Sequence, residues 1–162
     1  MATEYLDLDD AFDAYAEAVE VSVDRAKDAL LNLGQLESAL ARPQNAGAYE
    51  NADIVRQAAT LFWGVAANHA FRDGNKRTAV VLLRSFLNLN GYDMTLSEDE
   101  IFDLAVGVAD SRLSVDAAEA TLRPGVSPVV RDQRRGCPAT SRGAGGGIRT
   151  LTDLSAQRIL SP

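Results

Sequence analysis

The chain has 162 residues, of which 46% are apolar and 24% charged, as is typical of a globular protein with its own core. Its charge is unevenly divided: residues 1–123 hold 10 Lys/Arg and 21 Asp/Glu, whereas residues 124–162 hold 6 and 2. The second part also contains 6 of the 12 glycines and 4 of the 5 prolines. We therefore predict an acidic folded domain over residues 1–123, followed by a basic, disordered tail over residues 124–162.

These features exclude several classes of protein. A net acidic domain lacks the cationic surface that general nucleic-acid binding requires. No segment approaches the roughly 20 apolar residues of a membrane span, and the N-terminus lacks the pattern of a signal peptide. The only cysteine, Cys137, has no partner for an internal disulfide. We expect a cytoplasmic protein in a reducing setting.

The first half of the domain shows helical periodicity. Asp7 is positioned to cap a helix that the spacing of apolar residues extends to about residue 25. A short helix is predicted over residues 35–41, ending at Arg42 because Pro43 disfavours helical angles in the residue before it. Residues 43–50 are then expected to form a loop or a poorly formed hairpin.

Two long helices follow. One is predicted over residues 51–69, with His69 continuing its apolar stripe, and the other over residues 75–90, with Gly91 ending it in a left-handed turn. A capping-box pattern at residues 97–100 starts a helix to about residue 110, and a last helix covers residues 115–122. No strand is predicted. The fold class is all-α, a bundle of about six helices.

The segment between the two long helices has an unusual composition: residues 69–77 read His-Ala-Phe-Arg-Asp-Gly-Asn-Lys-Arg. Lys76 and Arg77 fall in the first turn of a helix, where each cation is unfavourable by roughly 0.3–1 kcal/mol. The chain has one other lysine, so a lysine here is not background composition. A bound anion removes the conflict, because helix N-terminal amides and two cations together form a phosphate site.

Two further residues of this segment carry chemistry. Asp73 is a hard oxygen ligand suited to Mg²⁺, which binds one or two carboxylates together with substrate phosphates. His69 can accept a proton at neutral pH. Taken singly, a histidine at a helix end, an Asp-Gly turn and a core Phe71 are each explained by structure alone. Together they suit phosphoryl or nucleotidyl transfer to a hydroxyl.

Residues 69–77 resemble the signature of the Fic/Doc family, and Lys76 resembles the Doc (death-on-curing) toxin branch. The resemblance covers about residues 4–123. It implies a compact helical fold with a flap, matched here by residues 43–50. By the same resemblance His69 is the general base, Asp73 the Mg²⁺ ligand, and Phe71 a core residue. The expected nucleotide-phosphate site comprises Gly74, Asn75, Lys76 and Arg77.

The resemblance also implies a reaction. AMP-transferring relatives have glycine at the position of Lys76, whereas the Doc-like branch uses lysine and delivers the γ-phosphate of ATP to elongation factor Tu, which halts translation. One alternative is AMP transfer, favoured by Gly74 and by Ala67 where a Doc-like arginine is expected. Another is a catalytically silent partner-binding module, favoured by Ala67, by Ala70, which replaces a common proline, and by the unusual tail.

The sequence also suggests how the protein is regulated and what role the tail has. The Ser/Thr-x-x-x-Glu pattern of self-inhibited relatives does not occur in the sequence, which favours control by a separate Phd-like antitoxin. The tail is interpreted as an extension without a selected role, or alternatively as a basic arm that binds an acidic partner.

Overall fold

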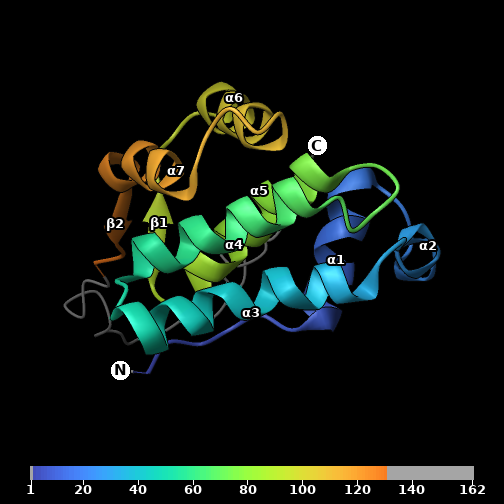
Figure 1. Ribbon diagram of the computed structural model, residues 1–162, viewed down its shortest axis with the longest axis horizontal. Helices are drawn as coiled ribbons and strands as arrows, with labels where there is room; N and C mark the ends of the chain where they lie inside the picture. The colour runs from blue at the N-terminus through green and yellow to red at the C-terminus, as the bar shows by residue number, and fades with distance from the viewer. Residues whose placement is uncertain (1, 131–162) are drawn as a thin grey trace, which may run out of the picture. The chain divides into compact units, whose positions relative to one another are not determined.

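The computed structural model describes residues 2–130, and the predicted tail lies almost entirely outside them. The described part is helical with one small sheet, which confirms the all-α class (Figure 1). Its elements in chain order are α1 (Leu8–Val19), α2 (Val23–Ala29), α3 (Leu33–Glu50), α4 (Ile54–Asn68), α5 (Asn75–Leu89), β1 (Tyr92–Met94), α6 (Glu98–Ala109), α7 (Val115–Leu122), a 3₁₀ turn (Arg123–Gly125) and β2 (Val126–Pro128).

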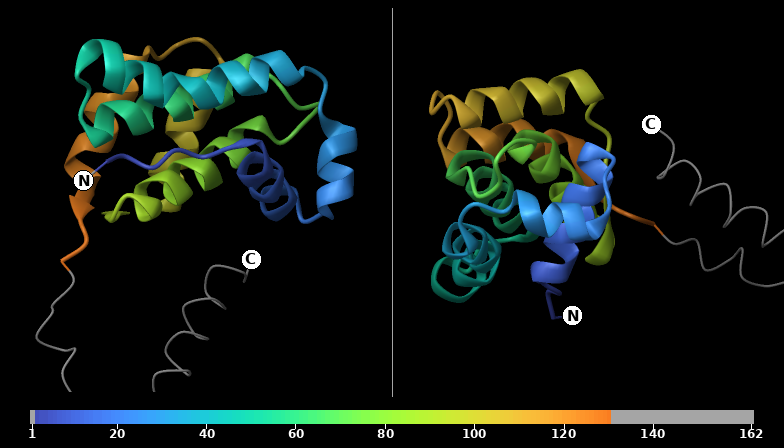
Figure 2. Two further views of the ribbon diagram at one scale, coloured as in Figure 1. Left: turned by 90° about the horizontal axis from the view of Figure 1, so that it is seen from below. Right: turned by 90° about the vertical axis from the view of Figure 1, so that its right-hand side faces the viewer.

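Helix α4 is the centre of the fold. It lies antiparallel to α3 after a short turn, while α5 packs on its other side and α7 and α6 also contact it (Figure 2). Its sequence is apolar on most of its circumference, as a helix covered on several sides requires. Ten of its residues are buried: Val55, Gln57, Ala58, Ala59, Thr60, Leu61, Phe62, Gly64, Val65 and Ala66.

The predicted end of a helix at Arg42 is wrong. Helix α3 continues through Pro43 to Glu50, although proline in a helix interior costs about 3 kcal/mol or more. The apolar stripe explains the continuation, because its spacing runs unbroken across the proline and keeps the whole helix against α4. The buried residues of that stripe are Leu36, Ala39, Leu40, Pro43 and Ala46.

The first predicted helix is also divided in two. Helix α1 ends at Val19, Glu20 adopts the left-handed conformation at φ 58°, and the N–H of Val21 donates to the carbonyl of Ala16. The side chain of Ser22 then caps α2 by accepting from the N–H of Arg25. Other helix ends agree with expectation: Asp7 and Ser97 form capping boxes, and Gly91 has φ 78°.

Strands β1 and β2 were not predicted, because three residues are too few to show an alternating pattern. They pair antiparallel with Met94 opposite Val126. The carbonyl of Gly125 accepts from the N–H of Thr95 at 2.8 Å, and the N–H of Val129 donates to the carbonyl of Gly91 at 2.8 Å. The folded unit therefore extends to Val129, beyond the predicted boundary after residue 123.

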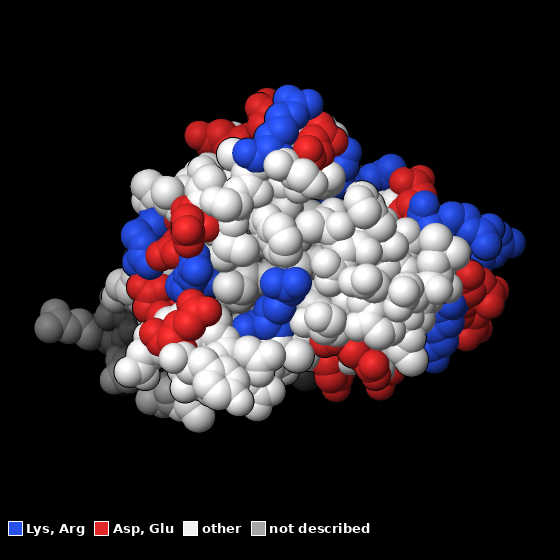
Figure 3. All heavy atoms as spheres, viewed as in Figure 1, with Lys and Arg blue, Asp and Glu red and all other residues white. Residues whose placement is uncertain are grey.

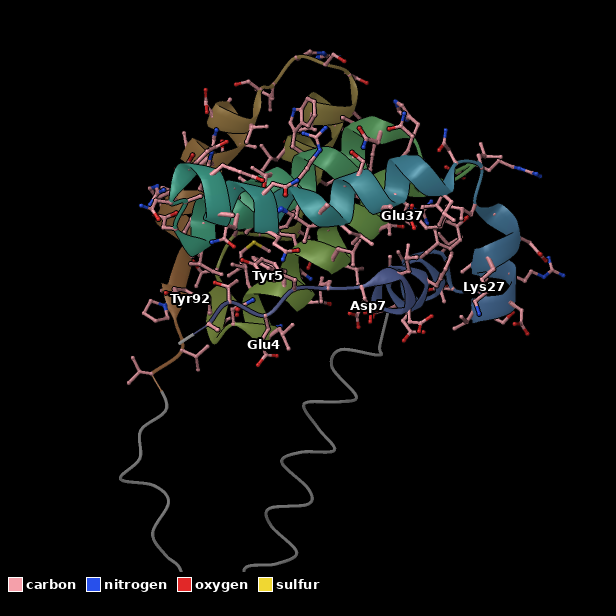
Figure 4. All side chains as sticks on the ribbon, turned by 60° about the horizontal axis from the view of Figure 1, so that its bottom comes forward. Glu4, Tyr5, Asp7, Lys27, Glu37 and Tyr92 are labelled. Atoms are coloured by element: carbon pink, nitrogen blue, oxygen red, sulfur yellow. The ribbon has the colours of Figure 1, made fainter. Side chains whose placement is uncertain are left out.

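The N-terminal segment is held against α5 rather than left free. The side chain of Asn90 accepts from the N–H of Glu4 at 2.8 Å and donates to its carbonyl at 2.9 Å. The ring of Tyr5 stacks on that of Phe86, with centroids 6.3 Å apart. Figure 4 shows the segment carrying Glu4 and Tyr5 crossing α5.

Shortening the chain tests the role of β2. A chain ending at Pro124 loses the β1–β2 ladder and the hydrogen bond to Gly125, whereas one ending at Val130 keeps both. We expect the shorter chain to be less stable by about 1–2 kcal/mol, and its melting temperature to fall by roughly 4 °C or more. Circular dichroism melts of the two chains measure this. Equal melting temperatures would show that β2 contributes nothing.

Asp53 gives the fold a pH-dependent contribution. Its carboxylate accepts from the guanidinium of Arg123 at 2.7 Å and from the N–H of Arg56 at 2.9 Å, capping α4. These two hydrogen bonds, the one from Arg123 first, lower the pKa of Asp53 in the folded chain. The stabilisation is therefore complete above the unfolded pKa of about 3.9 and disappears as the pH falls through the folded value.

Asp53→Ala is accordingly expected to cost about 1 kcal/mol at neutral pH, mainly through the lost cap, because the ion pair is solvent-screened. The difference from the unmodified chain shrinks in acid. Urea unfolding across this pH range measures both, with Asp103→Ala, an exposed residue of α6, as the control. A cost that stays constant down to the acid limit would contradict the assignment.

Candidate phosphate-binding and active site

The candidate site lies in the loop that joins α4 to α5. His69 ends α4 as an exposed residue in the left-handed conformation, at φ 49°. The prediction that His69 continues the buried stripe of α4 is therefore wrong, since the backbone turns at this residue. The exposed imidazole of His69 is accessible to a substrate, as a catalytic base must be.

Phe71 anchors the loop in the core. It is 1% exposed, stacks on Tyr15 with ring centroids 4.4 Å apart, and meets Phe12 edge to face at 6.4 Å. Burying an aromatic side chain of this size stabilises the folded state by about 1.5–3 kcal/mol. The resemblance-based expectation of a core role for Phe71 is confirmed.

Asn75 fixes the same loop from the start of α5. Its side chain accepts from the N–H of Phe71 at 2.9 Å and donates to the carbonyl of Phe71 at 2.8 Å. Both ends of the amide are therefore engaged in holding the loop. Asn75 can offer its backbone N–H to an anion, but its side chain shapes the site rather than lining it.

Residues 30–32, at the corner between α2 and α3, cross the loop as a strap. The sequence patterns did not reveal this contact. The carbonyl of Ala70 accepts from the N–H groups of Leu31 and Asn32, at 2.8 and 3.1 Å. In return, the N–H of Arg72 donates to the carbonyl of Ala29 at 2.9 Å. The loop and this segment thus exchange hydrogen bonds in both directions, in a short antiparallel strand-like contact.

The flap expected at residues 43–50 is not found there. Those residues are the last turns of α3, and the α3–α4 turn lies at the start of α4, the end opposite His69. The irregular segment next to the candidate site is instead the strap around Leu31, whose side chain is 61% exposed.

Helix α5 begins without a side-chain cap. Gly74 is its N-cap residue, and no side chain accepts from its first-turn N–H groups. By contrast, each of the other six α-helices in residues 2–130 has a side-chain cap: Asp7, Ser22, Asn32, Asp53, Ser97 and Ser114. The uncapped turn concentrates partial positive charge where an anion can bind.

The charged residues of the site stand around this turn. Lys76 is partly buried and Arg77 exposed, and within residues 2–130 neither forms an ion pair. Asp73 is exposed, and its carboxylate accepts from the N–H of Gly74 at 2.7 Å. The described residues contain no cluster of three metal-ligating side chains, so a metal ion at Asp73 would take most of its ligands from other molecules.

A pocket of about 420 Å³ opens beside Asp73, between the loop and helices α1 and α2. It is lined by Tyr15, Val21, Arg25, Asp28, Ala29, Arg72 and Asp73. His69, Lys76 and Arg77 lie outside it. The candidate site thus has two parts, the uncapped turn of α5 and a pocket that meets it at Asp73.

Gly74 is required by local geometry. It has φ 77°, and a Cβ atom built there would lie 2.6 Å from Cγ2 of Val19. A side chain at this position would therefore force Val19 or the loop to shift.

Within residues 2–130 no helix is both long and apolar enough to cross a membrane.

Comparisons with known proteins identify the family of the chain. The sequence model of the Fic/DOC family matches residues 5–87. The chain is 35% identical over 126 residues to "Toxin Doc" of Mycolicibacterium smegmatis, covering 74% of this chain and 92% of that protein. It is 37% identical over 91 residues to "Protein kinase doc" of Escherichia phage P1, covering 56% and 71%. The chain belongs to the Fic/DOC family, and these relatives place it with the Doc branch.

Alanine substitution separates the two reasons why position 74 is glycine, which are its positive φ and its close contact with Val19. Gly91 has nearly the same φ, 78°, but nothing lies within 4 Å of an added Cβ. Gly91→Ala should therefore report backbone strain alone, about 1–2 kcal/mol. We expect Gly74→Ala to cost about 1–3 kcal/mol more through overpacking. Urea unfolding measures both variants.

Val19→Ala supplies the control, because it removes the methyl group that an alanine at position 74 would meet. In that background the extra cost of Gly74→Ala should largely disappear and the backbone cost should remain. Equal costs for Gly74→Ala and Gly91→Ala would contradict the close-packing argument.

Proposed function

We propose that the protein is a Doc-like toxin that transfers the γ-phosphate of ATP to a hydroxyl of a target protein. The observation that carries this proposal is the uncapped first turn of α5 with Lys76 and Arg77 beside it. Amides, cations and a neighbouring carboxylate are the groups that position and neutralise a transferring phosphoryl group. The names of the two relatives, a toxin and a protein kinase, support the same interpretation.

Each residue has a proposed role in this reaction. Backbone N–H groups at the start of α5, with the side chains of Lys76 and Arg77, bind the phosphate oxygens. Asp73 would hold Mg²⁺, and the bound ion would supply positive charge that neutralises the phosphates. His69 accepts the proton of the target hydroxyl as its oxygen attacks the γ-phosphorus, and ADP leaves.

The Doc branch also suggests partners. Elongation factor Tu is the proposed target, as the resemblance implies, and modification of it would halt translation in the cytoplasm. A separate Phd-like antitoxin is the proposed inhibitor. In support, the sequence lacks the Ser/Thr-x-x-x-Glu pattern of self-inhibited relatives.

AMP transfer is less well supported. Gly74, one of the two residues that favoured it, is explained by its contact with Val19. The glycine therefore carries no information about which phosphate is transferred. The side chain of Ala67 carries no charge, so it can bind the phosphates neither for phosphate transfer nor for AMP transfer.

Labelled nucleotides test the proposal. We expect label to pass from [γ-³²P]ATP to elongation factor Tu in the presence of Mg²⁺, and not from [α-³²P]ATP. His69→Ala should lower the rate at least about 10²-fold, since it removes the positioned base. Lys76→Ala should weaken transfer, whereas Lys27→Ala, which changes the only other lysine and lies on α2, should leave it nearly unchanged.

The outcomes separate the alternatives. Transfer from the α-labelled nucleotide alone would assign AMP transfer and overturn the kinase proposal. Absence of any transfer, together with normal growth of cells that express the chain, would support the alternative of a catalytically silent binding module.

A further inference from the structure

The pocket of about 420 Å³ beside Asp73 has the volume of a small-molecule site. Its lining residues come from α1, from α2 and from the loop between α4 and α5. Of the residues with a proposed role in the reaction, only Asp73 lines it, and His69, Lys76 and Arg77 do not. A ligand that fills both the pocket and the phosphate site therefore has a phosphate end joined to a second group near Asp73.

Tyr15 connects the pocket with the start of α5. Its side chain is 5% exposed and stacks on Phe71, so the ring is held rigidly in the pocket wall. A Cβ atom built on Gly74 would lie 3.4 Å from Cε2 of this ring and 3.9 Å from Cζ, which carries the hydroxyl group. The pocket is therefore contiguous with the N-cap of α5, where the phosphates are proposed to bind.

The charges that line the pocket argue against a phosphate inside it. Arg25 and Asp28 come from α2, and Arg72 and Asp73 come from the loop, so the lining holds two charges of each sign. Figure 3 shows the same mixture over α2, where acidic and basic groups lie side by side at the right-hand end of the view. A phosphate in the pocket would approach two carboxylates at short range. A lining of balanced charge instead suits an uncharged ligand that has both donors and acceptors.

A nucleobase is a ligand of this kind. Its flat face stacks on guanidinium and aromatic groups, and its edge both donates and accepts hydrogen bonds. Arg25 and Arg72 supply guanidinium groups from two walls of the pocket, and Val21 and Ala29 add apolar surface. The carboxylate of Asp28 can only accept hydrogen bonds, so it matches the amino group of adenine. Phosphates bound at α5 bring the nucleoside of ATP to this pocket, because the two are covalently joined.

We infer that this pocket receives the nucleoside of ATP, and that Arg25 and Asp28 of α2 determine which base is accepted. The inference rests on the proposed function, since it assigns the remainder of the same nucleotide. The γ-phosphate is the end of ATP furthest from the nucleoside. It therefore lies outside the pocket, as His69 does.

Isothermal titration calorimetry in the presence of Mg²⁺ separates the two ends of the ligand. Methyl triphosphate is the comparison, because it has the charge of ATP without the nucleoside. The full chain should bind ATP at least about tenfold more tightly than methyl triphosphate. The double variant Arg25→Ala/Asp28→Ala should lose most of this advantage, about fivefold or more, and should bind methyl triphosphate as before.

Helix α2 offers a matched control. The double variant Asp24→Ala/Lys27→Ala also removes one acidic and one basic group three residues apart, and neither of these residues lines the pocket. It should bind both ligands as the unmodified chain does. Melting temperatures verify that each variant folds, and the comparison of ATP with methyl triphosphate on the unmodified chain stands without any variant.

The triphosphate of purine riboside tests the role of Asp28, because its base lacks the amino group of adenine. The full chain should bind it at least about fivefold more weakly than ATP, and Asp28→Ala should remove the difference. A difference that persists in Asp28→Ala would overturn the role of Asp28.

The outcomes distinguish the inference from the proposed function. Equal affinities for ATP and methyl triphosphate, or an ATP affinity unchanged in Arg25→Ala/Asp28→Ala, would overturn the inference and leave the phosphate site in place. Binding of neither ligand would overturn the inference and the proposed function together.

Discussion

The position of Phe71 in the core is the constraint on which the site depends. A loop carrying His69, Asp73 and two cations is strongly hydrated, and nothing in those side chains would hold it against the body of the protein. Stacking on Tyr15 draws the loop inward. That burial leaves the backbone of Phe71 without water, and the amide of Asn75 replaces both lost hydrogen bonds. The side chain that begins α5 is thereby used to hold the preceding loop, and the first-turn N–H groups have no side-chain cap.

The rest of the fold places other elements around this loop. Helix α3 packs along α4 past Pro43, so the corner that precedes α3 arrives beside Ala70 and pairs with it. Helix α1 supplies Tyr15 and, at its end, Val19, whose side chain meets Gly74. The site is therefore assembled from segments distant in sequence, which gives its geometry the stability of the core rather than of a surface loop.

The sequence predicts those features whose cause is local. The caps at Asp7 and Ser97 and the left-handed turn at Gly91 depend on neighbouring residues only, and all three are present. The prediction for Pro43 failed because a local rule was outweighed by burial of a stripe against α4, which no neighbouring residue reveals. The sequence indicates a ligand-binding role for Asn75 but not its hydrogen bonds to Phe71. Those bonds could not be predicted, because they form only once the loop has its conformation.

Arg56, Arg84, Arg112 and Arg123 each pair with a carboxylate. The other six of the ten cations in residues 1–123 form no ion pair within the described residues, although that segment holds 21 acidic groups. At α5 two of them join a set of backbone donors, and such convergence suits a multiply charged phosphate.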